Sequence, residues 1–394
     1  MFREFPMNLY KERLPQSVLV VAGEASGEMY AAKLVNALEN RVPGFASRFF
    51  GCGGESLRKM GVEIIIENSQ FSVLGPFEAI SHLSHFFTSM NRLVLESKRR
   101  NTQFAILVDF PDFNIPLAKR LKKNGIGIIY FVSPQLWAWR KSRIHKLKKV
   151  VDQMIVILPF EKQFYAKYGM QVKYFGHPLV DHVKVSCSYE SFLKKYQLDR
   201  DVLNISLLPG SRKKEIQFNL PTMLRVAQRI QWERPSQFLV PIASSEHRDM
   251  IDALKQSVVP DLSMKIIQSD TYNTMAYSNL AVVSSGTATL ETALLNTPLI
   301  AVFRISSLSW IVGKCLIDVP YYSLVNLIAG RKIIPELYQQ NFTEEKLYEE
   351  IQRLLDNSVC DSHVRMGLAE VREKLGSRGA IEKIAEFVET WIRG

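Results

Sequence analysis

The chain has 394 residues, and its 50 lysines and arginines against 39 aspartates and glutamates give a formal net charge of +11 at pH 7. Hydrophobic residues make up 47% and charged residues 23% of the chain, which excludes a largely disordered protein, a collagen and a small disulfide scaffold. At roughly 150 residues per domain, the length predicts two domains. The four cysteines form no Cys-x-x-Cys pair, so a zinc ribbon or redox dithiol is not expected and a reducing compartment fits.

The basic charge points to an anionic partner: nucleic acid, a phosphorylated metabolite or an anionic lipid surface. Charge alone does not choose among these, and many enzymes carry such a charge without any such partner. No stretch approaches the roughly 20 apolar residues that a membrane-spanning helix needs. Residues 1–16 lack the apolar core of a signal peptide and are expected to form an N-terminal extension.

Short apolar runs alternate with helical segments along most of the chain, which is typical of parallel sheets covered by helices on both faces. In the N-terminal half the expected strands are Val18–Ala22, Phe104–Val108, Ile126–Val132 and Gln153–Leu158. After an aperiodic linker at residues 176–188, strands are expected at 204–208, 238–241, 264–267, 280–283 and 298–303, and helices from Thr343 to the end. The pattern predicts two doubly wound α/β domains facing a central cleft, with ligands beyond the carboxyl ends of the strands.

The segment Gly23–Glu28 (GEASGE) follows the first expected strand. Gly23, Ser26 and Gly27 would let backbone N–H groups and a hydroxyl approach an anion at a helix N-terminus. The alternative is a plain tight turn in which Ser26 caps the helix. Residues 51–56 (GCGGES) form a similar but weaker junction.

Two aspartates, Asp109 and Asp112, follow the second expected strand in the sequence DFPDFN. A carboxylate at the carboxyl edge of a sheet is suited to act as general base for an alcohol. The alternative is that Asp112 caps the next helix while Asp109 accepts backbone hydrogen bonds; it fits Asp112 better than Asp109.

Residues 133–149 (SPQLWAWRKSRIHKLKK) combine Ser133, Trp137 and Trp139 with seven basic residues. Aromatic side chains among cations can bind single-stranded nucleic acid, sit at a membrane interface or stack on a sugar. A loop packed by its tryptophans and followed by an ordinary basic helix has the same pattern, and the spacing does not decide between them.

The second domain has two strand-to-helix junctions suited to a nucleotide diphosphate. The first is LPGSRKKE, where Gly210, Ser211 and Arg212 offer backbone N–H groups and a forked guanidinium. The second is SSGTATLE, with the hydroxyls of Ser285, Thr287 and Thr289 at a helix start and Glu291 one turn later, where it could accept from ribose hydroxyls. Each junction alone could be a structural cap. No cluster with metal-ligand spacing stands out, so neither a metal nor another cofactor is expected.

Taken together, these motifs resemble the lipid-A-disaccharide synthase family from about residue 17 to 380. The strings that carry the resemblance are AGEASGE, DFPDFN, YFVSPQLWAWR, LPFEKQFY, GHPL, LLPGSRKKE, SSGTATLE and YYSLVNLIAGR, in that order. The chain departs from the family pattern at Glu28, where the family usually has Asp, and at Phe110, where it often has Ala.

The resemblance implies a GT-B-type fold and metal-independent, inverting transfer of 2,3-diacylglucosamine from its UDP derivative to 2,3-diacylglucosamine 1-phosphate, giving a β-1,6 disaccharide in lipid A biosynthesis. It implies an acceptor-binding, membrane-facing domain at residues 17–180, a UDP-sugar-binding domain at 181–360 and C-terminal helices at 361–394. It also implies a peripheral protein on the cytoplasmic face of the inner membrane. The sequence leaves open whether those helices cross back to the N-terminal domain or join a second copy in a homodimer.

The resemblance also implies roles for individual residues. Asp109 would accept the proton of the acceptor hydroxyl, and Arg212 would stabilise the leaving UDP. The residues expected to contact the UDP-sugar are Gly210, Ser211, Arg212, Ser285, Gly286, Thr287, Ala288, Thr289, Glu291, Asn326 and Arg331. Those expected to contact the acceptor are Gly23, Glu24, Ser26, Gly27, Ser133, Trp137 and Trp139.

An amphipathic helix is expected between Leu74 and Arg100, where it would either dip into a lipid headgroup region or face the protein core. Two alternatives to the first function remain open. One is another UDP-sugar transferase or a UDP-sugar epimerase of the same architecture. The other is a basic nucleic-acid-binding protein, although nothing else in the sequence resembles a nucleic-acid module, so no nucleic-acid partner is expected.

Overall fold

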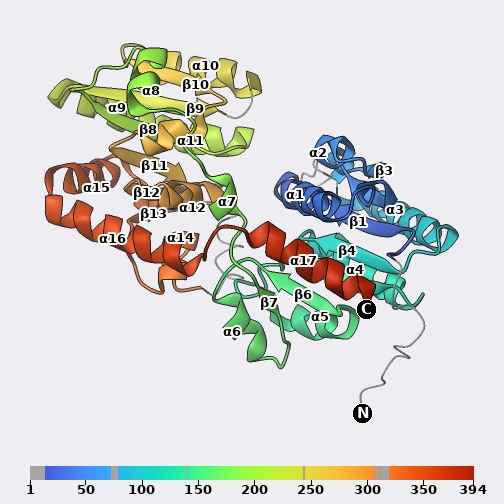
Figure 1. The fold of residues 1–394 in the computed structure, drawn as a ribbon. Coiled ribbons are helices and arrows are strands. Elements are labelled where there is room, and N and C mark those ends of the chain that lie inside the picture. Colours follow the sequence, from blue (N-terminus) through green and yellow to red (C-terminus); the bar gives the residue numbers. More distant parts are fainter. Residues whose placement is uncertain (1–13, 72–78, 140, 243–244, 307–309, 311–318) are drawn as a thin grey trace. The chain divides into compact units, whose positions relative to one another are not determined.

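The computed structural model describes residues 14–71, 79–139, 141–242, 245–306, 310 and 319–394. The chain divides into two units, Met1–Pro178 with Ser377–Gly394, and Leu179–Gly376 (Figure 1). Residues 1–13 of the expected N-terminal extension lie outside the described residues, as do residues 74–78 of the expected amphipathic helix and residue 140 in the tryptophan segment.

The first unit is built on a seven-stranded parallel sheet with the strand order β3-β2-β1-β4-β5-β6-β7. Its strands are β1 (Val18–Ala22), β2 (Phe49–Gly53), β3 (Glu63–Glu67), β4 (Phe104–Val108), β5 (Gly127–Phe131), β6 (Gln153–Val156) and β7 (Lys173–Tyr174). The four expected strands are present. Strands β2, β3 and β7 were not predicted, because β2 contains two glycines, β3 has a glutamate at each end and β7 has two residues.

Helices cover both faces of this sheet and bury two hydrophobic clusters. One cluster includes side chains from α1 (Ala25–Arg41) and α17 (Ala380–Arg393), so the last helix of the chain belongs to the first unit. The other cluster includes side chains from α3 (Ala79–Arg99), α4 (Pro111–Lys122) and α5 (Ile144–Val150). The short helices of this unit are α2 (Glu55–Lys59) and α6 (Glu161–Ala166).

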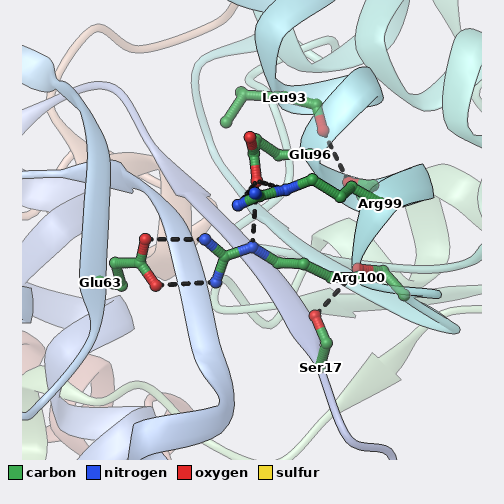
Figure 2. Close-up of polar contacts among 8 residues, drawn as sticks. Ser17, Glu63, Leu93, Glu96, Arg99 and Arg100 are labelled. Carbon is green, nitrogen blue, oxygen red and sulfur yellow. Dashed lines mark hydrogen bonds and ion pairs between the residues drawn. The ribbon is translucent and has the colours of Figure 1, made fainter.

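Arg100, just after α3, fixes the end of that helix to the sheet (Figure 2). Its guanidinium donates to both carboxylate oxygens of Glu63 in β3, each at 2.7 Å, and to Glu96 at 3.2 Å. It also lies 4.6 Å from the ring centroid of Phe50 in β2. A bidentate pair of this kind fixes direction as well as distance, so the end of α3 is held against β2 and β3.

The second unit contains a six-stranded parallel sheet with the order β10-β9-β8-β11-β12-β13. Its strands are β8 (Leu203–Leu208), β9 (Ser236–Ile242), β10 (Met264–Gln268), β11 (Leu280–Ser284), β12 (Leu299–Phe303) and β13 (Glu336–Tyr338). The helices in the described part of this unit are α7 (Leu179–His182), α8 (Tyr189–Tyr196), α9 (Lys213–Glu233), α10 (Arg248–Val258), α11 (Thr271–Ala276), α12 (Thr287–Leu294), α14 (Leu324–Ala329), α15 (Glu344–Asp356) and α16 (Ser358–Lys374). The expected linker therefore contains one short helix, α7.

The two sheets follow the same winding rule. In each, the chain builds three strands outward, returns to the first and continues on its other side, so the order reverses between β1 and β4 and between β8 and β11. Loops that leave the carboxyl ends of the two strands at such a reversal diverge, and ligands of open α/β sheets bind in the crevice between them. Searching the described residues for a helix both long and apolar enough to cross a membrane gives none.

Candidate active site

At the reversal in the first unit, the end of β4 lies against the start of α1. A Cβ atom built on Gly27 in α1 would lie 3.7 Å from Cβ of Asp109, and one built on Gly23 would lie only 2.2 Å from the ring of Phe110. The close approach of the chain that follows β4 therefore requires a glycine at position 23, whereas a Cβ on Gly27 would make ordinary van der Waals contacts. Asp109 and the loop after β1 meet because β1 and β4 are neighbouring parallel strands.

The carboxyl group of Asp109 is partly buried, and this burial, with a smaller contribution from the charge of Glu24, raises its pKa to about 7. A hydrogen bond from the backbone N–H of Phe110 opposes the shift. The Asp109 carbonyl accepts from the Tyr130 hydroxyl at 2.5 Å and from Asn114 Nδ2 at 2.9 Å, which fixes the backbone. A carboxyl that titrates near neutrality is suited to remove a proton from an alcohol and return it to water.

The other members of the first junction point to solvent. Glu24 is the N-cap of α1, with an extended backbone and no side-chain cap bond, and Ser26 lies exposed within the first turn. The alternative in which Ser26 caps the helix is therefore wrong, because the N-cap position is Glu24, two residues earlier.

Glu28 explains the weaker GCGGES junction. Its carboxylate accepts from the backbone N–H of Ser56 at 2.8 Å and of Leu57 at 3.3 Å, and from Asn68 Nδ2 at 2.7 Å. A Cβ on Gly54 would lie 2.8 Å from Glu28 Oε2. The start of α2 is thus occupied by a carboxylate from α1, and this junction is structural.

Asp112 and Asp109 differ in their surroundings. The carboxylate of Asp112 is exposed, in the first turn of α4, and accepts from Arg143 at 2.5 Å. It therefore ties α4 to the segment that follows the tryptophans, while Asp109 faces the start of α1.

The loop after β5 carries the expected acceptor residues Ser133, Trp137 and Trp139. Ser133 and Trp137 are buried, and Trp137 packs edge-on against Phe160 with a ring distance of 5.0 Å, whereas Trp139 is partly exposed. The hydroxyl of Ser133 donates to the carboxyl of Glu161, which also accepts from the Leu158 N–H at 3.0 Å. Ser133 and Trp137 therefore hold the loop, and Trp139 is the more exposed of its two tryptophan rings.

Glu161 was not predicted as part of this region. It is fully buried at the start of α6, and burial raises its pKa to about 7. The family string LPFEKQFY contains this residue, and a glutamate at the first position of a helix is ordinarily taken for a solvent-exposed first-turn acid. Only the contact with Ser133, 28 residues away, shows that it joins two loops at the same sheet edge.

The raised pKa of Asp109 predicts a pH-dependent effect on stability. Its folded value of about 7 exceeds the ordinary 3.8, so the native state binds more protons and loses stability as pH rises between these values. Asp109→Asn is expected to raise the free energy of unfolding at pH 8 by roughly 2–4 kcal/mol, and to change it little near pH 4. Thermal denaturation at the two pH values measures this, with Asp112→Asn as the exposed control; an equal change at both pH values would contradict it.

At the reversal in the second unit, β8 pairs with β11, with Leu208 beside Val283. The loops after these strands carry residues 210–212 and 285–289. Asn219 in α9 fixes them together: its amide donates to the carbonyl of Pro209 at 2.8 Å and to Ser284 Oγ at 3.3 Å, and its oxygen accepts from the N–H of Arg304 at 2.9 Å. Asn219 was not predicted, because its spacing from either motif carries no signal.

Arg212 extends from the N-cap position of α9, and 79% of its side chain is exposed. Glu215 accepts from the backbone N–H of Ser211 at 3.0 Å and of Arg212 at 3.4 Å, and its other oxygen lies 3.3 Å from Arg212 Nη1. A Cβ on Gly210, which has a φ of 129°, would lie 2.5 Å from Glu215. Glu215 thus accepts the backbone N–H groups that were expected to bind a diphosphate. The Arg212 guanidinium is the group of this junction that extends into solvent.

The second junction, at the start of α12, has exposed residues whose backbone N–H groups no side chain of the N-cap residue occupies. Gly286 and Thr287 are exposed at the start of α12, and the N-cap Gly286 has no side chain to occupy the amides of the first turn. Ser285 accepts from the Tyr338 hydroxyl at 3.2 Å, and the buried Thr289 donates to the Gly286 carbonyl at 2.8 Å. Ala288 is partly buried, and Glu291 accepts from the Tyr272 hydroxyl at 2.9 Å. An anion at this helix end would meet exposed N–H groups.

Asn326 lies in α14, and Arg331 lies between α14 and β13. Asn326 is fully buried, donates to the carbonyl of Ile334 and to Glu336, and accepts from the N–H groups of Ile333 and Ile334. Arg331 pairs with Glu370 of α16 at 2.6 Å. In this structure Asn326 shapes the loop from inside, and its expected contact with a nucleotide stays a prediction.

Two parallel sheets of this order, each with polar loops at its reversal, define the GT-B-like class of glycosyltransferases and sugar-nucleotide epimerases. The chain is similar to a UDP-GlcNAc 2-epimerase from Neisseria meningitidis bound to UDP-GlcNAc (TM-score 0.65, 10% identity, 95% of this chain and 100% of that one). It is also similar to a glycosyltransferase from Rickettsia africae (TM-score 0.58, 13% identity, 96% and 98%). These similarities establish the fold.

The sequence assigns the family. Residues 18–388 match the family described as lipid-A-disaccharide synthetase. The lipid-A-disaccharide synthase of Syntrophus aciditrophicus is 42% identical over 379 residues (95% of this chain, 98% of the relative), and that of Myxococcus xanthus 40% identical over 377 (95% and 97%). The chain belongs to the lipid-A-disaccharide synthase family, glycosyltransferases of lipid A biosynthesis, as the motifs predict. This assignment favours the first expected function over an epimerase or a nucleic-acid-binding protein.

Proposed function

We propose that the chain transfers 2,3-diacylglucosamine from its UDP derivative to the 6-hydroxyl of 2,3-diacylglucosamine 1-phosphate, with inversion and without a metal ion. The observation that carries this proposal is the position of Asp109, a carboxyl with a pKa near 7 at the strand-order reversal of the first unit. Family membership supports lipid A precursors as the substrates.

The proposed transfer is a single displacement at the anomeric carbon. Asp109 accepts the proton of the acceptor hydroxyl while its oxygen forms a bond to the anomeric carbon and the bond from that carbon to UDP breaks. Negative charge then grows on the diphosphate of the departing UDP. The Arg212 guanidinium, the Ser211 hydroxyl and the exposed amides at Gly286 and Thr287 are the groups of the second unit suited to stabilise it.

The experiment is incubation of the enzyme with UDP-diacylglucosamine and diacylglucosamine 1-phosphate, with mass spectrometry of the products. The expected result is one disaccharide 1-phosphate and one UDP per turnover, at a rate that a chelator leaves unchanged. Release of UDP without disaccharide, or a rate that depends on added divalent cation, would contradict the proposal.

The proposal includes binding at the cytoplasmic face of the inner membrane through α3. Among the side chains of α3 that the structure describes, Phe87 is 49% and Leu95 65% exposed. The guanidinium of Arg120 in α4 lies 5.6 Å from the ring centroid of Phe87, and Lys98 and Arg99 close the helix. Apolar side chains next to cations suit the interface of an anionic bilayer.

Phe86, by contrast, packs inside the unit. Its ring lies 5.1 Å from that of Phe71 and 5.5 Å from that of Phe113. One face of α3, with Phe86, therefore packs in the core, and another face, with Phe87, is exposed to solvent.

Phe87→Ser combined with Leu95→Ser is expected to weaken binding to vesicles of anionic phospholipid by roughly tenfold or more, because two apolar side chains lose their burial in lipid. Co-sedimentation measures the loss. Val359→Ser with Met366→Ser in α16 is the matched control, since those side chains are each 61% exposed. Equal binding by the α3 variant and the control would rule out this surface.

A further inference from the structure

The residue after Asp109 has an unusual backbone. Asp109 and Phe110 both lie in the left-handed region, with φ values of 48° and 47°. For residues with a side chain this conformation is uncommon and costs about 1–2 kcal/mol each. Two in succession must be held in place by contacts elsewhere.

The Phe110 ring supplies those contacts. It stacks on Phe113 with a centroid distance of 5.4 Å and an interplanar angle of 20°, and lies 5.4 Å from the Phe71 ring and 5.8 Å from the Phe86 ring. On its other side it covers Gly23, where even a methyl group would come within 2.2 Å of the ring. The ring is therefore wedged between an aromatic cluster and the backbone at the end of β1.

The backbone of Phe110 is coupled to the carboxyl of Asp109. The backbone N–H of Phe110 donates to that carboxyl, so the orientation of the Phe110 peptide sets the direction of the Asp109 side chain. The ionisable groups around this point are Glu24 of α1, Tyr130 of β5, Asp112 of α4 and His85 of α3, which packs on Phe71. Among them, Glu24 is the one whose charge shifts the pKa of Asp109, and burial is the larger cause.

We propose that Phe110 is a positioning residue for Asp109: its ring, wedged between Gly23 and Phe113, holds the left-handed pair and keeps water from the carboxyl group. The proposal rests on the proposed role of Asp109 as general base. In this proposal the Phe110 ring does more than fill space. If the ring could move, the Asp109 carboxyl would be both misdirected and better solvated.

The test is the pH dependence of kcat/KM. A better-solvated carboxyl has a lower pKa, so Phe110→Ala is expected to move the acid limb of the profile to lower pH by roughly one unit. Its plateau rate is expected to fall about tenfold, since a misdirected base reacts less often. Phe110→Leu, which keeps bulk over Gly23, is expected to hold the limb near its wild-type position.

Gly23→Ala provides an independent approach, because its methyl group would displace the ring without altering it. It is expected to shift the limb as Phe110→Ala does, and the double variant is expected to be no worse than Phe110→Ala alone. If Phe110→Ala does not fold, Gly23→Ala carries the test. Phe45→Leu is the matched control: it removes a buried ring that packs on Phe49 in the other hydrophobic cluster of the unit, and should lower thermal stability without moving the limb.

An unmoved limb in Phe110→Ala and Gly23→Ala, or an equal shift in Phe45→Leu, would overturn the proposal. Asp109→Asn separates this outcome from failure of the proposed function. If Asp109→Asn abolishes the acid limb while the Phe110 and Gly23 variants leave it in place, Asp109 is the base and Phe110 only packs. If Asp109→Asn keeps both the limb and the rate, the general-base role itself is wrong, and this proposal with it.

Discussion

Replacing Asp109 by asparagine is expected to lower kcat by about 10²–10⁴-fold, the usual contribution of a general base. Asparagine keeps the size of the side chain and the backbone bonds to Tyr130 and Asn114, so the fold is expected to remain intact. The loss should appear in kcat more than in KM, because the proton moves only in the transition state. Steady-state kinetics with both lipid substrates measures it.

Asp112→Asn is the matched control for this prediction. It makes the same chemical change three residues away, on an exposed carboxylate that pairs with Arg143 at 2.5 Å. Near-wild-type kinetics are expected. A comparable loss in both variants would mean that the segment after β4 tolerates no change of charge, and near-normal turnover in Asp109→Asn would remove Asp109 from the mechanism.

Arg212→Ala is expected to lower kcat by about 10²–10³-fold, the range seen when a donor to developing negative charge is removed. It should also weaken inhibition by the product UDP, since in the proposed mechanism the same guanidinium contacts the diphosphate before and after transfer. Arg212→Lys keeps the charge but loses the forked donor set, so it should fall between wild type and alanine. Kinetics with added UDP measures both effects.

The control for Arg212 is Arg225→Ala on the same helix, α9. Arg225 is exposed and pairs with Glu344 at 3.0 Å, away from the loops at the strand-order reversal. Its loss should leave kcat and UDP inhibition unchanged. If Arg212→Ala behaves like this control, leaving-group stabilisation belongs to the start of α12 and not to α9.

The sequence was sufficient for the strands that are buried on both faces, because continuous apolar runs such as Val18–Ala22 and Phe104–Val108 leave little ambiguity. It failed at β2 and β3, where glycines and terminal glutamates hide the strand. These strands form because β2 pairs with β1 and β3 pairs with β2, and no local sequence pattern reports such pairing.

The residues of the candidate site also fall into those that the sequence predicts and those that it does not. Asp109, Gly23, Arg212 and Gly286 lie at strand ends, so parallel topology alone brings them to the two reversals. Side chains that act across distant loops could not be predicted, since their partners are set by packing. Asn219 joins three strand ends and Glu161 reaches Ser133, 28 residues away.

The structure also changes the meaning of two motifs. In LPGSRKKE the glutamate occupies the backbone donors that the motif seemed to offer an anion. In DFPDFN the phenylalanine between the two acids proves to be the residue that requires glycine at position 23. Both effects depend on side-chain direction, which residue spacing does not encode.

The measurement that tests the central claim most directly is the pH dependence of the single-turnover rate of the wild-type enzyme with both lipid substrates bound. If the Asp109 carboxyl, with its pKa near 7, must be ionised to accept the proton, the rate should rise with pH through a single ionisation near neutrality and then level off. A rate that is already constant from pH 5 upward would contradict the account.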